Sequence, residues 1–503
     1  MLLLTVAGMW SAFGQGAQPA VTNAILAAAD RPSPRLSPDY TGIVLPPNIA
    51  PLNFRIEEPG SRYRVTLRST QGDVLRVESR KPTIRFPLKP WQRLVRANAG
   101  EPLICEISVL ESSGQWRSFP SVTNLIAREP IDRTLTYRLL KPLYSVYENV
   151  GIYQRDLESF EQRPVLENRH FNRGCLNCHI SLERRPDTFA FHIRTATNVH
   201  PMILVRSNVP CRVDKTMGYL AWHPSGQLIA YSGNKLSLFY HTRGETRDVF
   251  DARSDLGIYR LDSNTFSNPA PIAQTNRNET WPAWSPDGRY LYFSSAAPLS
   301  VEEFRQVRYD LMRVSYDLAT DRWGQPELLL AASASGGSAT QPKVSPDGRY
   351  LLFCISRYGN FPVYQASSDL YVMDLATLQL IRPNINSERT ESWHCWSGNS
   401  RWVVFSSKRL DGLFSRPFFS YVDAQGNFHK PFLLPQADPE FYESFLKNFN
   451  VPELLSGSVS VSERTLAETI NCPSRKVVPS QVASEARQPS TAPESTDPAR
   501  YPQ

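Results

Sequence analysis

The sequence predicts an all-β protein with more than one domain. Aromatic residues that favour strands are abundant, with 21 Tyr, 24 Phe and 10 Trp among 503 residues, and 41 Pro supply turns. Short runs of alternating polar and apolar residues recur along the chain, and one turn with its flanking strands is repeated. A chain of this length can bury several cores, so about two to four domains are expected.

The repeated unit is a β-hairpin. In one copy it reads Ser-Pro-Asp-Gly-Arg-Tyr-Leu-Leu-Phe. Pro fixes φ at the corner of the turn, Asp or Ser caps it, and Gly supplies a positive φ at its exit. A strand before the turn and an apolar strand after it complete the hairpin. The four copies lie within residues 221–232, 282–294, 342–353 and 394–406.

Further strands at matching offsets give each unit about four strands, which make one blade of a β-propeller. The turns recur about every 50–60 residues, and residues 187–217 can form one more blade. We therefore predict a five- or six-bladed β-propeller over residues 186–456, closed by an amphipathic helix at 439–455. The alternative is a sandwich of unrelated hairpins, which would rarely give a fixed repeat period. Residues 457–503, rich in Pro, Ser, Thr and Ala, predict a disordered tail.

The part before the propeller divides into four segments. Residues 1–14 are apolar and end in small residues, which predicts a signal peptide; because the first basic residue is Arg31, an apolar N-terminal arm is the alternative. Residues 15–42 contain Ser-Pro pairs and predict a linker. Residues 43–127 alternate in short strands, which predicts a β-sandwich with the strand rhythm of fibronectin type III modules. Residues 128–185 predict a connector.

This connector carries the motif Cys175-Leu176-Asn177-Cys178-His179. Covalent haem attachment needs two thiols for the two vinyl groups and an adjacent imidazole for the iron, and this spacing is typical of c-type haem. A zinc half-site would need a second Cys/His pair nearby, and none follows. A redox dithiol would be expected in a βαβ setting, which is lacking. We therefore expect one covalent haem c held by Cys175, Cys178 and His179. The other five cysteines are odd in number, which excludes a complete disulfide framework.

The repeats also resemble a known group of proteins. The sequence Ser-Pro-Asp-Gly-Arg-Tyr-Leu-Tyr-Phe-Ser-Ser at 285–295 resembles the WD40-like repeat of TolB-type propellers. The stretch from about 130 to 455 resembles exported bacterial TolB-like propeller proteins that carry one c-type haem motif upstream of the repeats. The matching segments are residues 172–179, 186–194 and 222–226. The resemblance implies the fold and the haem, whereas function must be argued from the site.

The second ligand of the iron stays open. His192 lies in one of the matching segments and is favoured, with Met202 as the alternative, which would raise the redox potential. His200, His170 and His223 are also within reach, although His223 more simply orders its own turn. An empty sixth position would favour ligand binding or catalysis. Arg173, Arg184, Arg185 and Arg194 surround the motif, and one or two of them are expected to pair with the haem propionates, with Arg173 and Arg194 chosen as candidates; a solvated surface charge is the alternative for each.

We expect an exported, periplasmic electron-transfer protein that docks a redox or envelope protein on a face of the propeller, in a membrane-associated complex. The alternatives are a haem-dependent oxidoreductase and an envelope scaffold with a structural haem. The net charge of +7 is spread over interspersed acidic and basic residues, so a nucleic-acid partner is not expected. The sequence contains neither a Gly-x-Ser-x-Gly elbow nor a glycine-rich phosphate loop.

Overall fold

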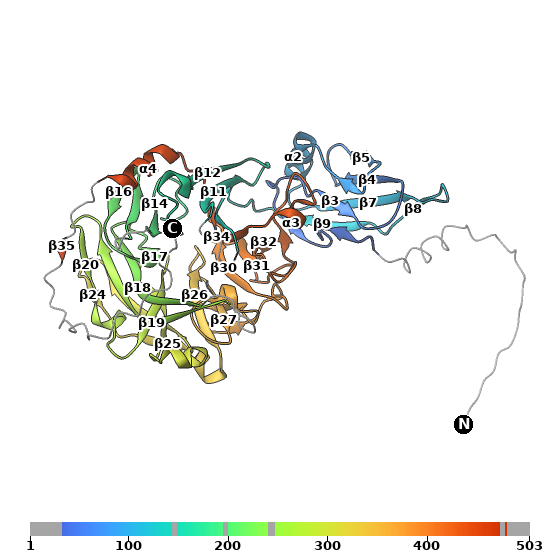
Figure 1. Cartoon of the computed structure of the whole chain (residues 1–503). Coiled ribbons are helices and arrows are strands. Elements are labelled where there is room, and N and C mark those ends of the chain that lie inside the picture. Colours follow the sequence, from blue (N-terminus) through green and yellow to red (C-terminus); the bar gives the residue numbers. More distant parts are fainter. Residues whose placement is uncertain (1–32, 143–147, 195–199, 240–246, 473–477, 480–503) are drawn as a thin grey trace, which may run out of the picture.

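The computed structural model describes residues 33–142, 148–194, 200–239, 247–472 and 478–479. The predicted signal peptide lies outside the described residues. Most regular structure in the described part is β-strand, which confirms the all-β prediction. Figure 1 shows a ring of sheets with the N-terminal region attached at one side.

The ring consists of six sheets, here called blades 1 to 6. In each blade, one of the two edge strands of the sheet lies innermost in the ring. The innermost strands β13, β17, β21, β26, β30 and β34 contact one another in this order, and β34 contacts β13. The contacts therefore close a six-bladed, propeller-like ring, as the repeat predicts.

The strands of the blades have the following bounds. Blade 1 contains β10 (Thr134–Leu140), β11 (Gly151–Asp156), β12 (Gln162–Glu167) and β34 (Asn448–Leu455). Blade 2 contains β13 (Cys175–Ser181), β14 (Phe189–Arg194), β15 (Met202–Arg206) and β16 (Val209–Val213). Blade 3 contains β17 (Gly218–Trp222), β18 (Leu228–Phe239), β19 (Asp248–Arg260), β20 (Thr265–Ser267) and β35 (Val478–Pro479).

The remaining blades carry the clearest repeats. Blade 4 contains β21 (Asn278–Trp284), β22 (Tyr290–Ala296), β23 (Asp310–Asp317), β24 (Arg322–Trp323) and β25 (Glu327–Leu330). Blade 5 contains β26 (Ser338–Val344), β27 (Tyr350–Ser356), β28 (Asp369–Asp374) and β29 (Leu380–Ile381). Blade 6 contains β30 (Glu391–Trp396), β31 (Trp402–Ser407), β32 (Arg416–Tyr421) and β33 (Phe432–Leu433). Short 3₁₀ helices occur in the connections: η2 (Asn168–His170), η3 (Ala270–Ile272), η4 (Val301–Gln306), η5 (Ala332–Ser335) and η6 (Pro362–Tyr364).

Three boundary predictions are corrected. Residues 128–185 are not a connector, because they supply three strands of blade 1 and the innermost strand of blade 2. The predicted closing helix at 439–455 is instead a single turn, α3 (Phe441–Ser444), followed by strand β34, which pairs with β10 and joins the two ends of the ring. The predicted tail at 457–503 begins with a helix, α4 (Glu463–Asn471), because the side chains of Leu466 and Ile470 bury against blades 1 and 2.

Each innermost strand contains a bulge at the same position, where its pairing with the next strand shifts. In five blades the residue at the bulge has a left-handed backbone, which is unusual for large side chains. These residues are Tyr219, Trp281, Gln341, Trp393 and Val451. A repeated strain of this kind must be offset by packing, and the bulge side chains indeed gather at the centre of the ring.

The described part of the N-terminal region, residues 33–127, forms two sheets and one helix. The larger sheet contains β2 (Val44–Leu45), β9 (Val122–Ile126), β7 (Pro102–Leu110), β4 (Arg62–Arg68), β5 (Leu75–Ser79) and β8 (Trp116–Ser118). The smaller sheet contains β1 (Leu36–Ser37), β3 (Phe54–Ile56) and β6 (Thr83–Ile84). Helix α2 (Leu88–Ala97), which the sequence analysis did not predict, buries Trp91, Leu94 and Val95. The expected alternation along β4 is present, with Val65 and Leu67 inside.

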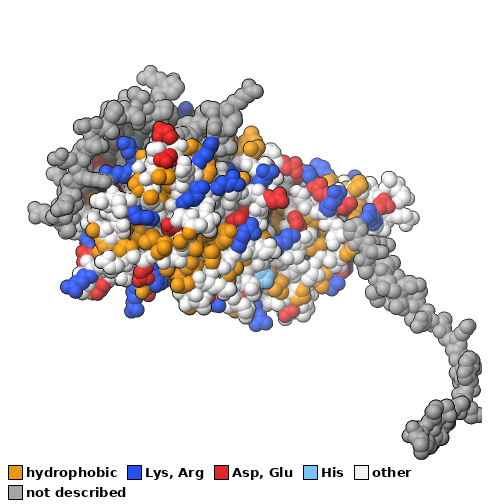
Figure 2. All heavy atoms as spheres, turned by 90° about the horizontal axis from the view of Figure 1, so that it is seen from below, with side chains coloured by type: hydrophobic (Ala, Val, Ile, Leu, Met, Phe, Trp, Pro, Cys, Tyr) orange, Lys and Arg blue, Asp and Glu red, His pale blue; other side chains and the backbone are white. Residues whose placement is uncertain are grey.

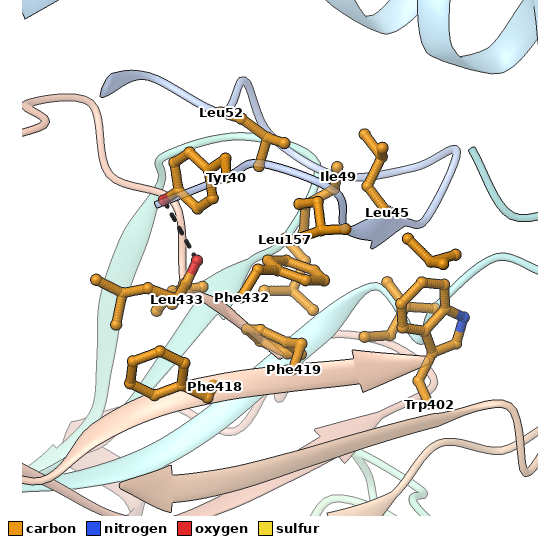
Figure 3. Close-up of a cluster of buried hydrophobic side chains, with 14 of the residues drawn as sticks. Tyr40, Leu45, Ile49, Leu52, Leu157, Trp402, Phe418, Phe419, Phe432 and Leu433 are labelled. Atoms are coloured by element: carbon orange, nitrogen blue, oxygen red, sulfur yellow. Dashed lines mark hydrogen bonds between the residues drawn. The ribbon is translucent and has the colours of Figure 1, made fainter. Parts of the chain in front are cut away.

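The N-terminal region and the ring share one core. Figure 3 shows Ile49 and Leu52 packed above Phe419 and Phe432 of blade 6. Tyr40 donates a hydrogen bond of 3.3 Å to the carbonyl oxygen of Leu433. A continuous apolar core fixes the N-terminal region on the side of blades 1 and 6.

Acidic and basic side chains are interspersed on the face of the molecule shown in Figure 2, between apolar side chains. None of the helices in the described part is long and apolar enough to cross a membrane.

Candidate functional site

The Cys-x-x-Cys-His motif forms β13, the innermost strand of blade 2. Cys178 occupies the bulge of this strand, and His179 therefore has the same place in its blade as His394 in blade 6. This register is not visible in the sequence, because Asn-Cys-His-Ile-Ser shares no residue with Thr-Trp-Pro-Ala-Trp of blade 4. Arg173, just before the strand, is exposed.

The imidazole of His179 is buried and unpaired. It faces blade 1, and its Nε2 lies 3.9 Å from Oε2 of Glu453, beyond hydrogen-bond range. Neither ring nitrogen has a hydrogen-bond partner in the described part of the chain. Burial, with the charge of Arg138, lowers the pKa of His179 to about 3, so the ring is neutral at pH 7, the form that binds metals. In contrast, Nε2 of His394 lies 3.0 Å from the carbonyl oxygen of Leu352.

The two thiols of the motif are free. Burial raises the pKa of Cys175 and of Cys178, and the guanidinium groups of Arg138 and Arg194 partly oppose this rise. Arg138 is fixed by its Nη1, which donates a hydrogen bond of 2.6 Å to Oδ1 of Asn177. Both thiols therefore stay protonated at neutral pH beside two positive charges.

His192 and Met202 lie on the other face of blade 2. They are in register with Asn177 across β13, β14 and β15, and Met202 belongs to the core between blades 2 and 3. Burial, with the charge of Arg194, lowers the pKa of His192 well below its usual value. The structure thus does not bring either predicted second ligand to the face occupied by His179.

The other histidines have different surroundings. His200 lies beside β15, and burial, with the charge of Arg194, lowers its pKa. His170 lies near the surface, with Nε2 3.7 Å from Glu463 of helix α4. Nδ1 of His223 accepts a hydrogen bond of 3.1 Å from the backbone N–H of Ser225, so His223 orders its own turn, as predicted, and its Nε2 lies 3.2 Å from the carbonyl oxygen of Gly288 in the next blade.

The centre of the ring holds a cavity of about 280 Å³. The innermost strands line it from their bulges to their C-terminal ends. We call the axis of the ring the channel, and the part of it that holds this cavity the turn end. Its floor is aromatic: the rings of Tyr219 and Trp281 stack with centroids 3.4 Å apart, and Trp393 meets Trp281 edge-on at 5.3 Å. Cys178 and His179 also line the cavity. No local motif marks this site, because every blade supplies only a few of its residues.

Cys175 does not line the cavity and lies at the opposite end of the channel, where the innermost strands begin. This Cys175 end is cationic. Arg247 and Lys408 both lie over the ring of Tyr364, at 4.8 and 5.8 Å from its centroid. Burial, with the charge of Arg247, lowers the pKa of Lys408 to about 8. Arg194 carries a further charge near the thiol.

The donor set fits a haem c in its chemistry, because two free thiols precede a buried imidazole with unpaired nitrogens. The cavity itself is smaller than the roughly 300–1,000 Å³ typical of sites for drug-sized ligands. It is therefore too small to enclose a porphyrin on its own.

No family model matches the sequence, and no curated protein matches it. Similar solved structures include an oligogalacturonate lyase in complex with manganese, at 11% identity and a TM-score of 0.32, over 67% of this chain and 86% of that chain. The propeller of Dos1 is 14% identical with a TM-score of 0.32, over 52% and 66% of the two chains. Prolyl oligopeptidase B from Galerina marginata is 9% identical with a TM-score of 0.35; the match covers 62% of this chain and 53% of that enzyme. The likeness concerns the fold alone.

Proposed function

We propose that this chain is an exported monohaem c-type cytochrome that transfers electrons. The observation that carries the proposal is the buried imidazole of His179, whose two nitrogens lack a partner among the described residues, directly after two free thiols. A buried polar group left unpaired costs about 1–3 kcal/mol, and bonding to iron would remove that cost. His394 has the same place in its blade, and its imidazole makes a hydrogen bond. The position in the blade therefore does not by itself leave an imidazole without a hydrogen-bond partner.

The roles of the other residues follow from their chemistry. Cys175 and Cys178 would each add their S–H across one vinyl group, forming an S–C bond and passing the proton to the neighbouring carbon, without an oxidant. Arg194, close to both thiols, would pair with a propionate, and Arg173, exposed just before the strand, would offer a second charge. The haem supplies a one-electron couple of ferric and ferrous iron.

The surroundings support docking of a protein partner. We propose that a redox or envelope protein binds the propeller face at the Cys175 end, in a membrane-associated complex of the periplasm. The positive charges of Arg247 and Lys408 at this end would steer an acidic partner. We further propose that the ring is of the TolB-like type and that the N-terminal region is a fibronectin type III-like sandwich that holds the ring in the complex.

A second candidate function is a haem-dependent oxidoreductase. It is favoured by the placement of His192 and Met202 on the face of blade 2 opposite to His179. If neither side chain reaches the iron, one coordination position stays open to small molecules. Carbon monoxide distinguishes the two functions: a reduced protein that does not bind it supports electron transfer, whereas rapid binding supports the enzyme.

The proposal is tested by expressing the full chain in a host competent for cytochrome assembly and staining for haem peroxidase activity after denaturing electrophoresis. The stain should appear with the chain and vanish when Cys175 and Cys178 are both replaced by serine. Cys395→Ser is the matched control, because this free thiol also lines the cavity but lies outside the motif. A chain that is correctly folded and exported, yet unstained, would overturn the proposal.

A further inference from the structure

The cavity at the turn end of the channel has features that the haem motif does not explain. Its walls are largely apolar and come from proline and tryptophan residues of several blades. They include Trp222, Pro282, Trp284, Pro342, Trp396 and Pro452. Such flat walls around about 280 Å³ suit a small, flat, apolar body.

Two buried donors in the cavity lack an acceptor. The amide of Gln341 is fixed through its Oε1, which accepts a hydrogen bond of 2.9 Å from the backbone N–H of Trp393. Its Nε2 and the indole Nε1 of Trp393 then have no partner within the described ranges. Gln341 is 4% exposed and Trp393 is 7% exposed. Buried donors are normally paired, so a ligand acceptor that reached either nitrogen would remove the cost of leaving it without a partner.

One positive charge in the cavity has no direct bonding partner among the described residues, although it interacts at longer range with the carboxylate of Glu453. Lys343 is half-buried on the innermost strand of blade 5, and its ammonium group makes no ion pair or hydrogen bond with the residues that the structure describes. The carboxylate of Glu453 also lines the cavity, but its Oε1 already accepts two hydrogen bonds from Ser181, of 2.9 Å from the backbone and 2.7 Å from the hydroxyl. These bonds hold the Glu453 carboxylate on Ser181 but leave its charge in place, so an anionic ligand would need a direct contact with Lys343 to outweigh the repulsion.

We propose that this cavity binds a small aromatic carboxylate. The aromatic ring would lie against the proline and indole walls, and the carboxylate would pair with Lys343. Additional acceptor atoms would take the hydrogens of Gln341 and Trp393. Cys178 and His179 line the same cavity, so the inference is tested on the protein both with and without haem.

The inference is tested by titrating the full-length protein with benzoate and with uncharged benzyl alcohol in a calorimeter. Wild type should bind benzoate, and Lys343→Met should weaken binding roughly ten- to hundredfold, the value of one charge-assisted hydrogen bond. Lys343→Arg keeps the charge and should keep binding within a few-fold, which separates charge from a folding defect. Lys89→Met, an exposed lysine of α2, should bind like wild type, and Lys343→Met should not change the response to benzyl alcohol.

The same titration is repeated on the haem-free variant that carries serine at both Cys175 and Cys178. Equal benzoate affinity with and without haem supports the inference. Binding only by the haem-free chain would assign the cavity to the haem and overturn the inference, as would a Lys343→Met variant that binds benzoate like wild type. Lack of benzoate binding in both forms would also overturn it, and would leave the haem proposal untouched.

Discussion

Replacement of His179 by leucine should stabilise the haem-free chain. In a background with serine at both motif thiols, the buried imidazole has no partner among the described residues, so leucine removes a polar group that costs about 1–3 kcal/mol. His394→Leu is the matched control, since this histidine has the same place in its blade. It gives up a hydrogen bond of 3.0 Å to the carbonyl oxygen of Leu352, so it should lower stability by about 0.5–1.5 kcal/mol.

The two variants should respond alike to acid. Burial lowers the pKa of both His179 and His394 to about 3, whereas an unfolded histidine titrates near 6.5. Between these values the unfolded chain binds a proton that the folded chain does not, so each histidine makes stability fall as the pH falls below about 6.5. From pH 6.5 to 5 this loss is about 2 kcal/mol for each histidine. Each leucine variant should therefore gain about 2 kcal/mol over its parent on going from pH 7 to 5.

The assay is urea unfolding followed by tryptophan fluorescence at pH 7 and pH 5, with midpoints compared among parent and variants. We expect opposite signs for the two variants at pH 7 and the same pH-dependent gain for both. The reasoning is refuted if His179→Leu loses as much stability at pH 7 as His394→Leu, because the imidazole would then have a partner in the haem-free chain.

Three further substitutions test the packing. Arg409→Met leaves the fully buried Glu391 without its ion pair of 3.1 Å and should cost about 3–5 kcal/mol in urea unfolding; an unchanged midpoint would contradict the assignment. Trp402→Ala empties the shared core of Figure 3 and should cost about 3–5 kcal/mol by the same assay, while a loss below about 1 kcal/mol would argue against a shared core. Leu466→Ala should release α4 from the ring, seen as faster amide hydrogen exchange over residues 463–471 with the blades unaffected; slow exchange would show that other contacts hold this helix.

The sequence predicts the hairpins of blades 3 to 6 well, because their Pro-Asp-Gly or related turns are local signals. The closing strand β34 is missed because its pairing with β10 joins residues some three hundred positions apart. A local signal existed nonetheless. Pro452 has the same place in its strand as Pro282 and Pro342, a position that tolerates proline because the innermost strand is an edge of its sheet.

The candidate site is predictable only in part. The spacing of Cys175, Cys178 and His179 selects the donors, but their placement in an innermost strand follows from the register of the whole ring. Which face of blade 2 each of His192 and His179 occupies depends on the bulge in β13, and a single sequence does not reveal a bulge. Lys343 had no motif to mark it, because its role in the cavity arises from six strands that converge only in the folded ring.

The most direct test of the central claim is mass spectrometry of the tryptic peptide Gly174–Arg184, from protein exported by a host competent for cytochrome assembly. Extraction with acidic acetone beforehand removes haem that is not covalently bound. We predict that this peptide carries one haem through two thioether bonds, at Cys175 and Cys178. Recovery of the peptide from folded protein with both thiols free would contradict the proposal that this chain is a c-type cytochrome.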